Sequence, residues 1–266
     1  MDQRNQAIAA AFDERAPGYR NSDWHRDSAQ RLVDLCRLGP GDRVLDAGTG
    51  TGFAALHAAR QVGPDGRVVG VDISEGMLNE ARAAAAASTV TNLELVQCDA
   101  TALARFPDGG FDAITCATSL LYIPVSDGLL EWRRLLRDGG VIGFSTIQAG
   151  FPVAARLFRS CAAEYGVVLE DPCAPLGSSA ACLQALGDAG FVGGEVVTEE
   201  LEFSSRDLDR AWESNLRSPI HQAVRALPAD TLAELEQRYR ALIAAEMEAD
   251  RARLLQSRML YALGRR

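Results

Sequence analysis

The sequence has no apolar run long enough to cross a bilayer, which takes about 20 consecutive apolar residues. Its first residues, "MDQRNQAIAAAFDER", carry acidic side chains and no basic segment ahead of an apolar core. A secretory signal needs that basic segment. We therefore expect a cytoplasmic protein without a membrane span.

Paired cysteines and an excess of basic residues are also missing. The six cysteines stand at positions 36, 98, 116, 161, 173 and 182, with no C-x-x-C pair and no histidine at zinc-finger spacing. This favours reduced thiols over disulfides or a metal site. The net charge of -9 argues against a nucleic-acid partner, because such proteins usually neutralise phosphates with basic patches. A small-molecule partner is the better expectation.

What the sequence does have is a regular alternation of strand-like and helix-like segments. Short apolar stretches rich in β-branched residues lie at 42–47, 67–73, 93–98, 111–117 and 141–147, and helical patterns separate them. This order is typical of a doubly wound α/β fold with a mainly parallel, Rossmann-like sheet. Two later strand-like segments, 194–203 and 257–264, would complete seven strands.

The chain divides by pattern into successive parts. We expect an N-terminal helical lid at 1–40, a cofactor-binding core at 41–150, segments completing the core at 151–206, a helical cap at 207–255 and a final strand at 256–266. The cap would thus be inserted before the last strand.

A glycine-rich loop follows the first strand, in the stretch "VLDAGTGTGFAAL" (44–56). Glycines between a strand and a helix N-terminus let backbone N–H groups and the helix dipole face a ligand. The dinucleotide pattern G-x-G-x-x-G fails, because Phe53 stands where its third glycine belongs, and no Walker lysine follows. Asp46, just before the glycines, suits a cationic ligand group better than a pyrophosphate.

Two further carboxylates close the next strands. Asp72 ends the second strand, about twenty residues beyond the glycines, where a carboxylate can accept hydrogen bonds from ribose hydroxyls. Asp99 follows the third strand. Since ligands of open parallel sheets lie beyond the carboxyl ends of the strands, Asp46, Asp72 and Asp99 should converge on one crevice.

Taken in order, "VLDAGTGTGFAAL", "VVGVDISEGML", "LELVQCDATAL", "FDAITCATSLLYIP" and "LRDGGVIGFST" resemble the motifs of class I S-adenosylmethionine-dependent methyltransferases, above all the ubiquinone/menaquinone-type small-molecule enzymes. The likeness is dense over 40–147, and "AFDERAPGY" (11–19) is similar to the family's N-terminal lid.

The resemblance implies S-adenosyl-L-methionine as cofactor, S-adenosyl-L-homocysteine as product, and a set of roles. Asp46 and the loop of Gly48, Thr49, Gly50 and Gly52 would hold the methionine moiety, and Asp72 the ribose. Ile73 and Met77 would flank the adenine, and Asp99 with the Ala100 backbone would bond its edge. Thr118, Ser119 and Leu120 would border the methionine end, with Tyr19 closing over it.

The end of the fourth strand excludes several acceptor classes. Its "ATSLLY" lacks the Asn/Asp-Pro-Pro-aromatic motif typical of base-amine methyltransferases, a Pro-Cys for cytosine chemistry, and the carboxylates of metal-dependent catechol enzymes. We expect no metal. Leu121 and Tyr122 replace the paired histidines of many quinone-type members.

That departure leaves the catalytic base open. The candidates are Tyr19, His25, Tyr122 and His221, with an aromatic wall the simpler role for Tyr122 and a structural role simpler for each histidine. Proximity and desolvation can carry much of a methyl transfer without any base.

Helical spacing of apolar residues, including Trp212, continues through 207–255. These helices could cover a substrate pocket lined by Tyr122 and Trp212, or form a homodimer interface. The sequence therefore predicts an enzyme that methylates a small, largely apolar metabolite, on oxygen, nitrogen or carbon, in secondary or specialised biosynthesis. The alternatives are a methyltransferase-fold protein that catalyses cyclisation or other non-transfer chemistry, and a non-catalytic binding module.

Overall fold

The computed structural model describes residues 2–266, so Met1 of the expected lid lies outside the described residues. These residues form one seven-stranded sheet in the order β3-β2-β1-β4-β5-β7-β6. Its strands are β1 (Arg43–Ala47), β2 (Arg67–Asp72), β3 (Leu93–Gln97), β4 (Phe111–Ala117), β5 (Leu136–Ile147), β6 (Val192–Glu202) and β7 (Gln256–Arg265).

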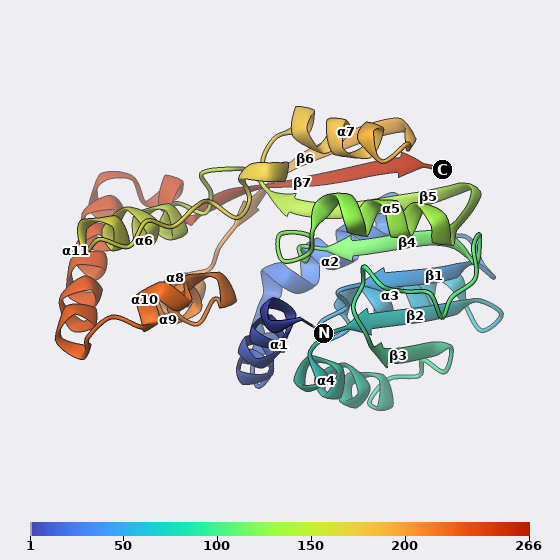
Figure 1. Ribbon diagram of the computed structural model, residues 1–266, viewed down its shortest axis with the longest axis horizontal. Helices are drawn as coiled ribbons and strands as arrows, with labels where there is room; N and C mark the ends of the chain where they lie inside the picture. The colour runs from blue at the N-terminus through green and yellow to red at the C-terminus, as the bar shows by residue number, and fades with distance from the viewer. Residues whose placement is uncertain (1) are drawn as a thin grey trace.

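The first five strands run parallel, as the alternating pattern predicted, and β7 pairs antiparallel with both β5 and β6. The predicted Rossmann-like, mainly parallel sheet is confirmed. Because the five parallel strands point the same way, their carboxyl ends meet along one edge of the sheet (Figure 1).

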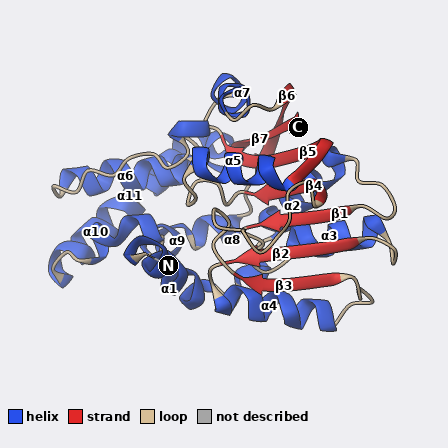
Figure 2. Ribbon diagram, turned by 45° about the vertical axis from the view of Figure 1, so that its right-hand side comes forward, coloured by secondary structure: helices blue, strands red, loops and turns tan. Residues whose placement is uncertain are grey.

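Helices cover both faces of the sheet (Figure 2). They begin with α1 (Gln3–Arg15), α2 (Asp23–Cys36), α3 (Phe53–Val62), α4 (Glu75–Ala86), α5 (Val125–Leu135), α6 (Val153–Glu164) and α7 (Ser179–Asp188). Neighbouring residues of β1 show why both faces need cover: Val44 packs in the cluster with α2 and α3, and Leu45 in the one with α5 and α7. Successive strand side chains point to opposite faces, so a sheet that is apolar on both buries both.

The remaining helices lie between β6 and β7: α8 (Ser205–Asp209), α9 (Ala211–Leu216), α10 (Gln222–Arg225) and α11 (Ala229–Leu255), with the 3₁₀ turn η3 (Pro219–His221). They lie beyond the carboxyl edge of the parallel strands (Figure 1). Two other 3₁₀ turns, η1 (Tyr19–Asn21) and η2 (Ala174–Leu176), lie in loops.

Helix α6 belongs with this group rather than with the sheet, which differs from the expected division at 151–206. Val153, Leu157 and Phe158 share a buried cluster with Leu235 and Tyr239 of α11. The difference arises because the apolar stripe of α6 predicts burial but not the partner. From here on, "cap" means α6 together with α8–α11.

Candidate functional site

A cavity lies at the carboxyl ends of β1, β2 and β4, beneath α1. Nearly all residues predicted to hold the cofactor line it. They are Tyr19, Asp46, Gly48, Thr49, Gly50, Asp72, Ile73, Met77, Asp99, Ala100, Thr118 and Ser119. Gly52 and Leu120 do not: Gly52 precedes α3 as its N-cap, and Leu120 is buried in the core beneath the sheet edge.

Asp46 is buried at the end of β1. Thr49 donates a hydrogen bond to its Oδ2 at 2.6 Å, and Thr115 of β4 donates to Oδ1 at 2.8 Å. Burial raises the pKa of Asp46 to about 6, and the two threonine hydrogen bonds act in the opposite direction. A buried carboxylate held in this way can bind a cationic group strongly.

Asp72 and Asp99 are fixed by local hydrogen bonds. The backbone N–H groups of Gly50 and Ser74 donate to the two oxygens of Asp72, at 2.8 and 2.9 Å. Thr101 donates to Asp99 through its N–H and its hydroxyl, both at 2.8 Å. A carboxylate oxygen can accept two hydrogen bonds, so Asp72 and Asp99 both keep capacity for a ligand.

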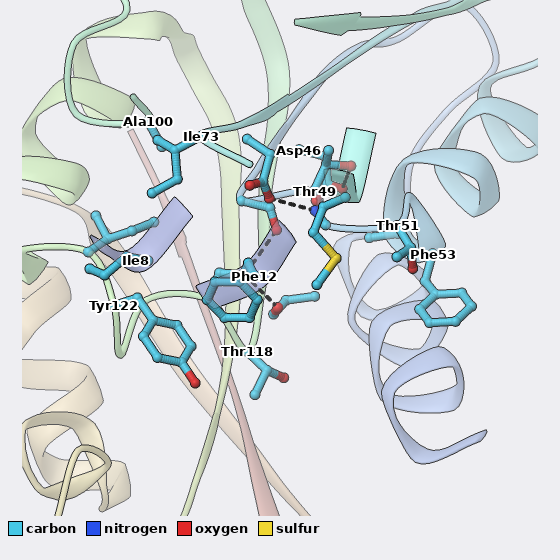
Figure 3. A pocket seen from close by; sticks show the side chains of 18 of the residues that line it. Ile8, Phe12, Asp46, Thr49, Thr51, Phe53, Ile73, Ala100, Thr118 and Tyr122 are labelled. Carbon is cyan, nitrogen blue, oxygen red and sulfur yellow. Dashed lines mark hydrogen bonds between the residues drawn. The ribbon is translucent and has the colours of Figure 1, made fainter. Parts of the chain in front are cut away.

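The lid helix α1 closes this cavity. Asn5 donates to Asp99 at 2.6 Å, and Asp13 accepts from the Ser74 hydroxyl and the Gly76 N–H. Phe12 meets the ring of Tyr122 edge to face, with centroids 5.0 Å apart. Figure 3 shows these two rings beside Thr118. Phe12 and Asn5 were not singled out from the sequence, although Phe12 lies in the lid-like stretch 11–19 and Asn5 precedes it.

Two features of the cavity lining fit S-adenosylmethionine. The hydroxyl of Thr51, which lines it, is buried without a hydrogen-bond partner. A Cβ on Gly50, whose φ is +54°, would meet nothing within 4 Å, so the loop presents open backbone there. An orphaned hydroxyl and bare backbone beside Asp46 suit the carboxylate and ammonium of an amino-acid moiety.

A second, larger cavity lies between the lid and the cap, with a volume of about 540 Å³ against about 110 Å³ for the first. Four residues line both cavities: Tyr19, His25, Thr118 and Tyr122. Thr118 holds a left-handed backbone conformation (φ +52°), and its N–H is bonded to Ser145. Such strain in a residue without glycine's freedom often marks a functional site.

The histidines separate in space. His25 stacks on Trp24, bonds Ser22 at 2.6 Å, and burial lowers its pKa to about 3. His221 lines only the second cavity, with Nδ1 2.8 Å from the Asn215 carbonyl oxygen. His57 lies outside both cavities, with Nε2 2.8 Å from Oδ1 of Asp34.

Trp212 does not line either cavity, contrary to its expected substrate role. It is 4% exposed and packs against Phe158 and Tyr239 inside the cap. Helical periodicity could not distinguish the face of α9 that meets the cavity from the face that meets α6.

No group of histidine, cysteine, aspartate or glutamate side chains among residues 2–266 could hold a metal ion. Over the same residues, none of the helices has the length and apolarity needed to cross a membrane.

Comparisons with known proteins agree with this geometry. Residues 44–140 match a family model described as a methyltransferase domain. Nocamycin O-methyltransferase of Saccharothrix syringae is 32% identical over 215 residues, which cover 73% of this chain and 76% of that protein. Demethylmenaquinone methyltransferase of Symbiobacterium thermophilum is 35% identical over 150 residues, 52% of this chain and only 58% of that protein.

Solved structures share the fold. Geranyl diphosphate C-methyltransferase of Streptomyces coelicolor A3(2) aligns with a TM-score of 0.54 at 20% identity, over 90% of this chain and 79% of that one. The [4+2]-cyclase SpnF aligns with a TM-score of 0.52 at 23% identity, over 89% and 81%. Given the domain match and the similarity along most of nocamycin O-methyltransferase, this chain belongs to the class I S-adenosylmethionine-dependent methyltransferases.

Proposed function

We propose that this chain transfers a methyl group from S-adenosylmethionine to a small, largely apolar metabolite held in the second cavity. The observation that carries the proposal is the shared wall of Tyr19, His25, Thr118 and Tyr122. A molecule in the larger cavity meets the cofactor cavity only along this wall. The methionine end of the cofactor is expected there, next to Thr118 and Ser119.

The chain's own residues contribute binding and exclusion of water. Bound S-adenosylmethionine supplies an electrophilic methyl group. Asp46 and the glycine loop hold its amino-acid end, Asp72 its ribose, and Asp99 its adenine edge, while Phe12 and Tyr122 shield the centre from solvent. Placing a nucleophile about 3 Å from the methyl carbon can supply several kcal/mol of the barrier reduction.

No strong base stands at the shared wall. The lowered pKa of His25 keeps its ring neutral and weakly basic. Burial raises the pKa of Tyr19 far above its usual range, so that hydroxyl stays protonated. We assign Tyr122 to the wall and His221 to acceptor recognition in the cap. An acceptor that reacts here must already be nucleophilic, or become so by losing its proton to water.

The names of the relatives support a small acceptor and specialised metabolism, since nocamycin O-methyltransferase and aklanonic acid methyltransferase are among them. The atom that is methylated is left open as oxygen, nitrogen or carbon. Cytoplasmic location, the absence of a nucleic-acid partner and homodimer formation are kept as predictions from the sequence.

Transfer of labelled methyl groups tests the proposal. The purified protein is incubated with methyl-labelled S-adenosylmethionine and extracts of small metabolites, and label is sought in the organic phase. Label in a product, with formation of S-adenosylhomocysteine, supports methyl transfer. An acceptor that is rearranged without label would favour the cyclisation alternative, which the shared fold of SpnF keeps relevant.

A further inference from the structure

The wall of the second cavity contains a largely buried arginine whose guanidinium has few hydrogen-bond acceptors in the protein. Arg159 of α6 is only 11% exposed at its side chain, and it lines the cavity. Among the described residues its one polar partner is Asp171, with Nη2 3.0 Å from Oδ2. A guanidinium carries five N–H donors, so most of its donors have no acceptor in the protein.

Asp171 does not depend on this arginine. Its Oδ2 accepts the N–H of Gly150 at 2.8 Å, and its Oδ1 accepts the N–H of Cys173 at 3.1 Å. These two bonds hold the carboxylate against the loop after β5. The ion pair therefore fixes the position of Arg159 without using up its hydrogen-bonding capacity.

The unpaired nitrogens of Arg159 keep access to the cavity. Each side-chain nitrogen of Arg159 that lacks a protein partner keeps some exposed surface. His221 stands close enough that the charge of Arg159 helps burial to lower its pKa. The counter-charge of the guanidinium is therefore Asp171 alone, and the N–H donors that this ion pair leaves free face the acceptor space.

We propose that Arg159 is the specificity-determining residue for the acceptor, and that it binds an ionised oxygen group, either a carboxylate or an enolate. The inference rests on the proposed function, because it assigns the second cavity to the acceptor. The planar guanidinium pairs with such oxygens through two parallel hydrogen bonds. The acceptor is then an amphipathic acid, anchored at the cap by its anion, with its apolar body along the cavity.

The test uses two pairs of rigid probes and the full-length protein saturated with S-adenosylhomocysteine. One pair is 2-naphthoate and its neutral amide, which tests carboxylate recognition. The other is 4-hydroxycoumarin, an acidic enol ionised near neutral pH, and its neutral methyl ether. Calorimetry gives the dissociation constant of each probe for the wild type, Arg159→Met, Arg159→Lys and Arg217→Met. Arg217 is a matched control, because it lines the same cavity but is exposed.

In the wild type and in Arg217→Met, at least one anion should bind tenfold or more tightly than its neutral partner. Arg159→Met should reduce that ratio to less than threefold, and Arg159→Lys should keep part of it. The pair that shows the preference identifies the anion as a carboxylate or an enolate. S-adenosylhomocysteine affinity should be equal in all four proteins, and their thermal midpoints show that each is folded.

The proposal is overturned if neither anion is preferred by the wild type, if the preference survives in Arg159→Met, or if Arg217→Met loses it equally. A purely structural arginine would lower the thermal midpoint of Arg159→Met and weaken anion and neutral probe alike, which also overturns it. Failure of the wild type to bind S-adenosylhomocysteine would instead count against the proposed function.

Discussion

Ser119 closes directly onto Gly48, joining the loop after β4 to the glycine loop after β1. The Ser119 hydroxyl donates to the Gly48 carbonyl oxygen at 2.9 Å. A Cβ on Gly48 would lie 2.6 Å from the Cβ of Ser119, and its φ is +67°. Only glycine fits both the contact and the backbone conformation.

Gly48→Ala is therefore expected to damage both folding and cofactor binding. Overpacking and a strained left-handed residue together should cost about 2 to 4 kcal/mol of stability. Gly50→Ala is the matched control: its φ of +54° brings a similar backbone strain, but a Cβ there meets nothing within 4 Å, so this variant should lose less stability than Gly48→Ala. Thermal midpoints and calorimetry with S-adenosylhomocysteine separate the two variants. Equal thermal midpoints for Gly48→Ala and the wild type would contradict the close packing of Gly48 against Ser119.

Asp46→Asn should increase stability while weakening the site. Because burial raises the folded pKa to about 6, the folded state prefers the protonated form, and the ionised carboxylate destabilises the fold above that pH. The difference from an ordinary aspartate corresponds to a cost of about 3 kcal/mol of stability at high pH. This cost disappears gradually as pH falls from above 6 towards about 4. Asparagine removes this cost, so its midpoint should exceed that of the wild type at pH 8 and approach it near pH 4.

The same variant should lose S-adenosylhomocysteine affinity by tenfold or more at pH 8, because the charge that attracts an ammonium group is gone. A variant that is more stable and binds as tightly as the wild type would remove Asp46 from the cofactor site.

Asp72→Ala tests the proposed ribose contact. Hydrogen bonds to a charged group contribute about 1.5 to 3 kcal/mol each, so affinity for S-adenosylhomocysteine should fall ten- to a hundredfold. Asp72 also accepts from Gly50 and Ser74, so Asp72→Asn, which keeps an acceptor oxygen for the loop, serves as the control and should lose less. An unchanged dissociation constant in Asp72→Ala would place the ribose elsewhere.

Activity is expected to survive chelation, since Ala117, Thr118 and Ser119 provide no carboxylate for a hard cation near the transfer point. Methyl transfer to the identified acceptor should be the same with and without EDTA. Activity lost to EDTA and restored by magnesium would contradict this prediction.

The sheet and the cofactor cavity were predictable because their signals are local. Asp46, Asp72 and Asp99 each lie at or just beyond the carboxyl end of a strand, and parallel strands bring such ends together without further information. The cap was predictable as helix only. Whether Trp212 faces a ligand, and whether α6 joins the sheet or α11, depends on contacts between segments far apart in sequence. Arg159 gave no signal in the sequence, because its proposed role depends on the N–H donors that its partner Asp171 leaves free.

Trp212→Ala distinguishes the structural position of Trp212 from the substrate role that periodicity suggested. The indole packs against Phe158, 5.5 Å away between ring centroids, and Tyr239, 5.7 Å away, in the buried cluster that joins α6 and α9 to α11. Losing it should cost about 3 to 5 kcal/mol of stability through the cavity left behind.

Because α6 also carries Arg159, loosening this cluster should weaken binding of the acceptor and lower the thermal midpoint together. Trp212→Phe, which keeps an aromatic ring in the cluster, should retain most of both. The measurements are the thermal midpoint, S-adenosylhomocysteine affinity and the Michaelis constant for the acceptor. A Trp212→Ala protein with an unchanged midpoint and a raised Michaelis constant would return Trp212 to the pocket wall.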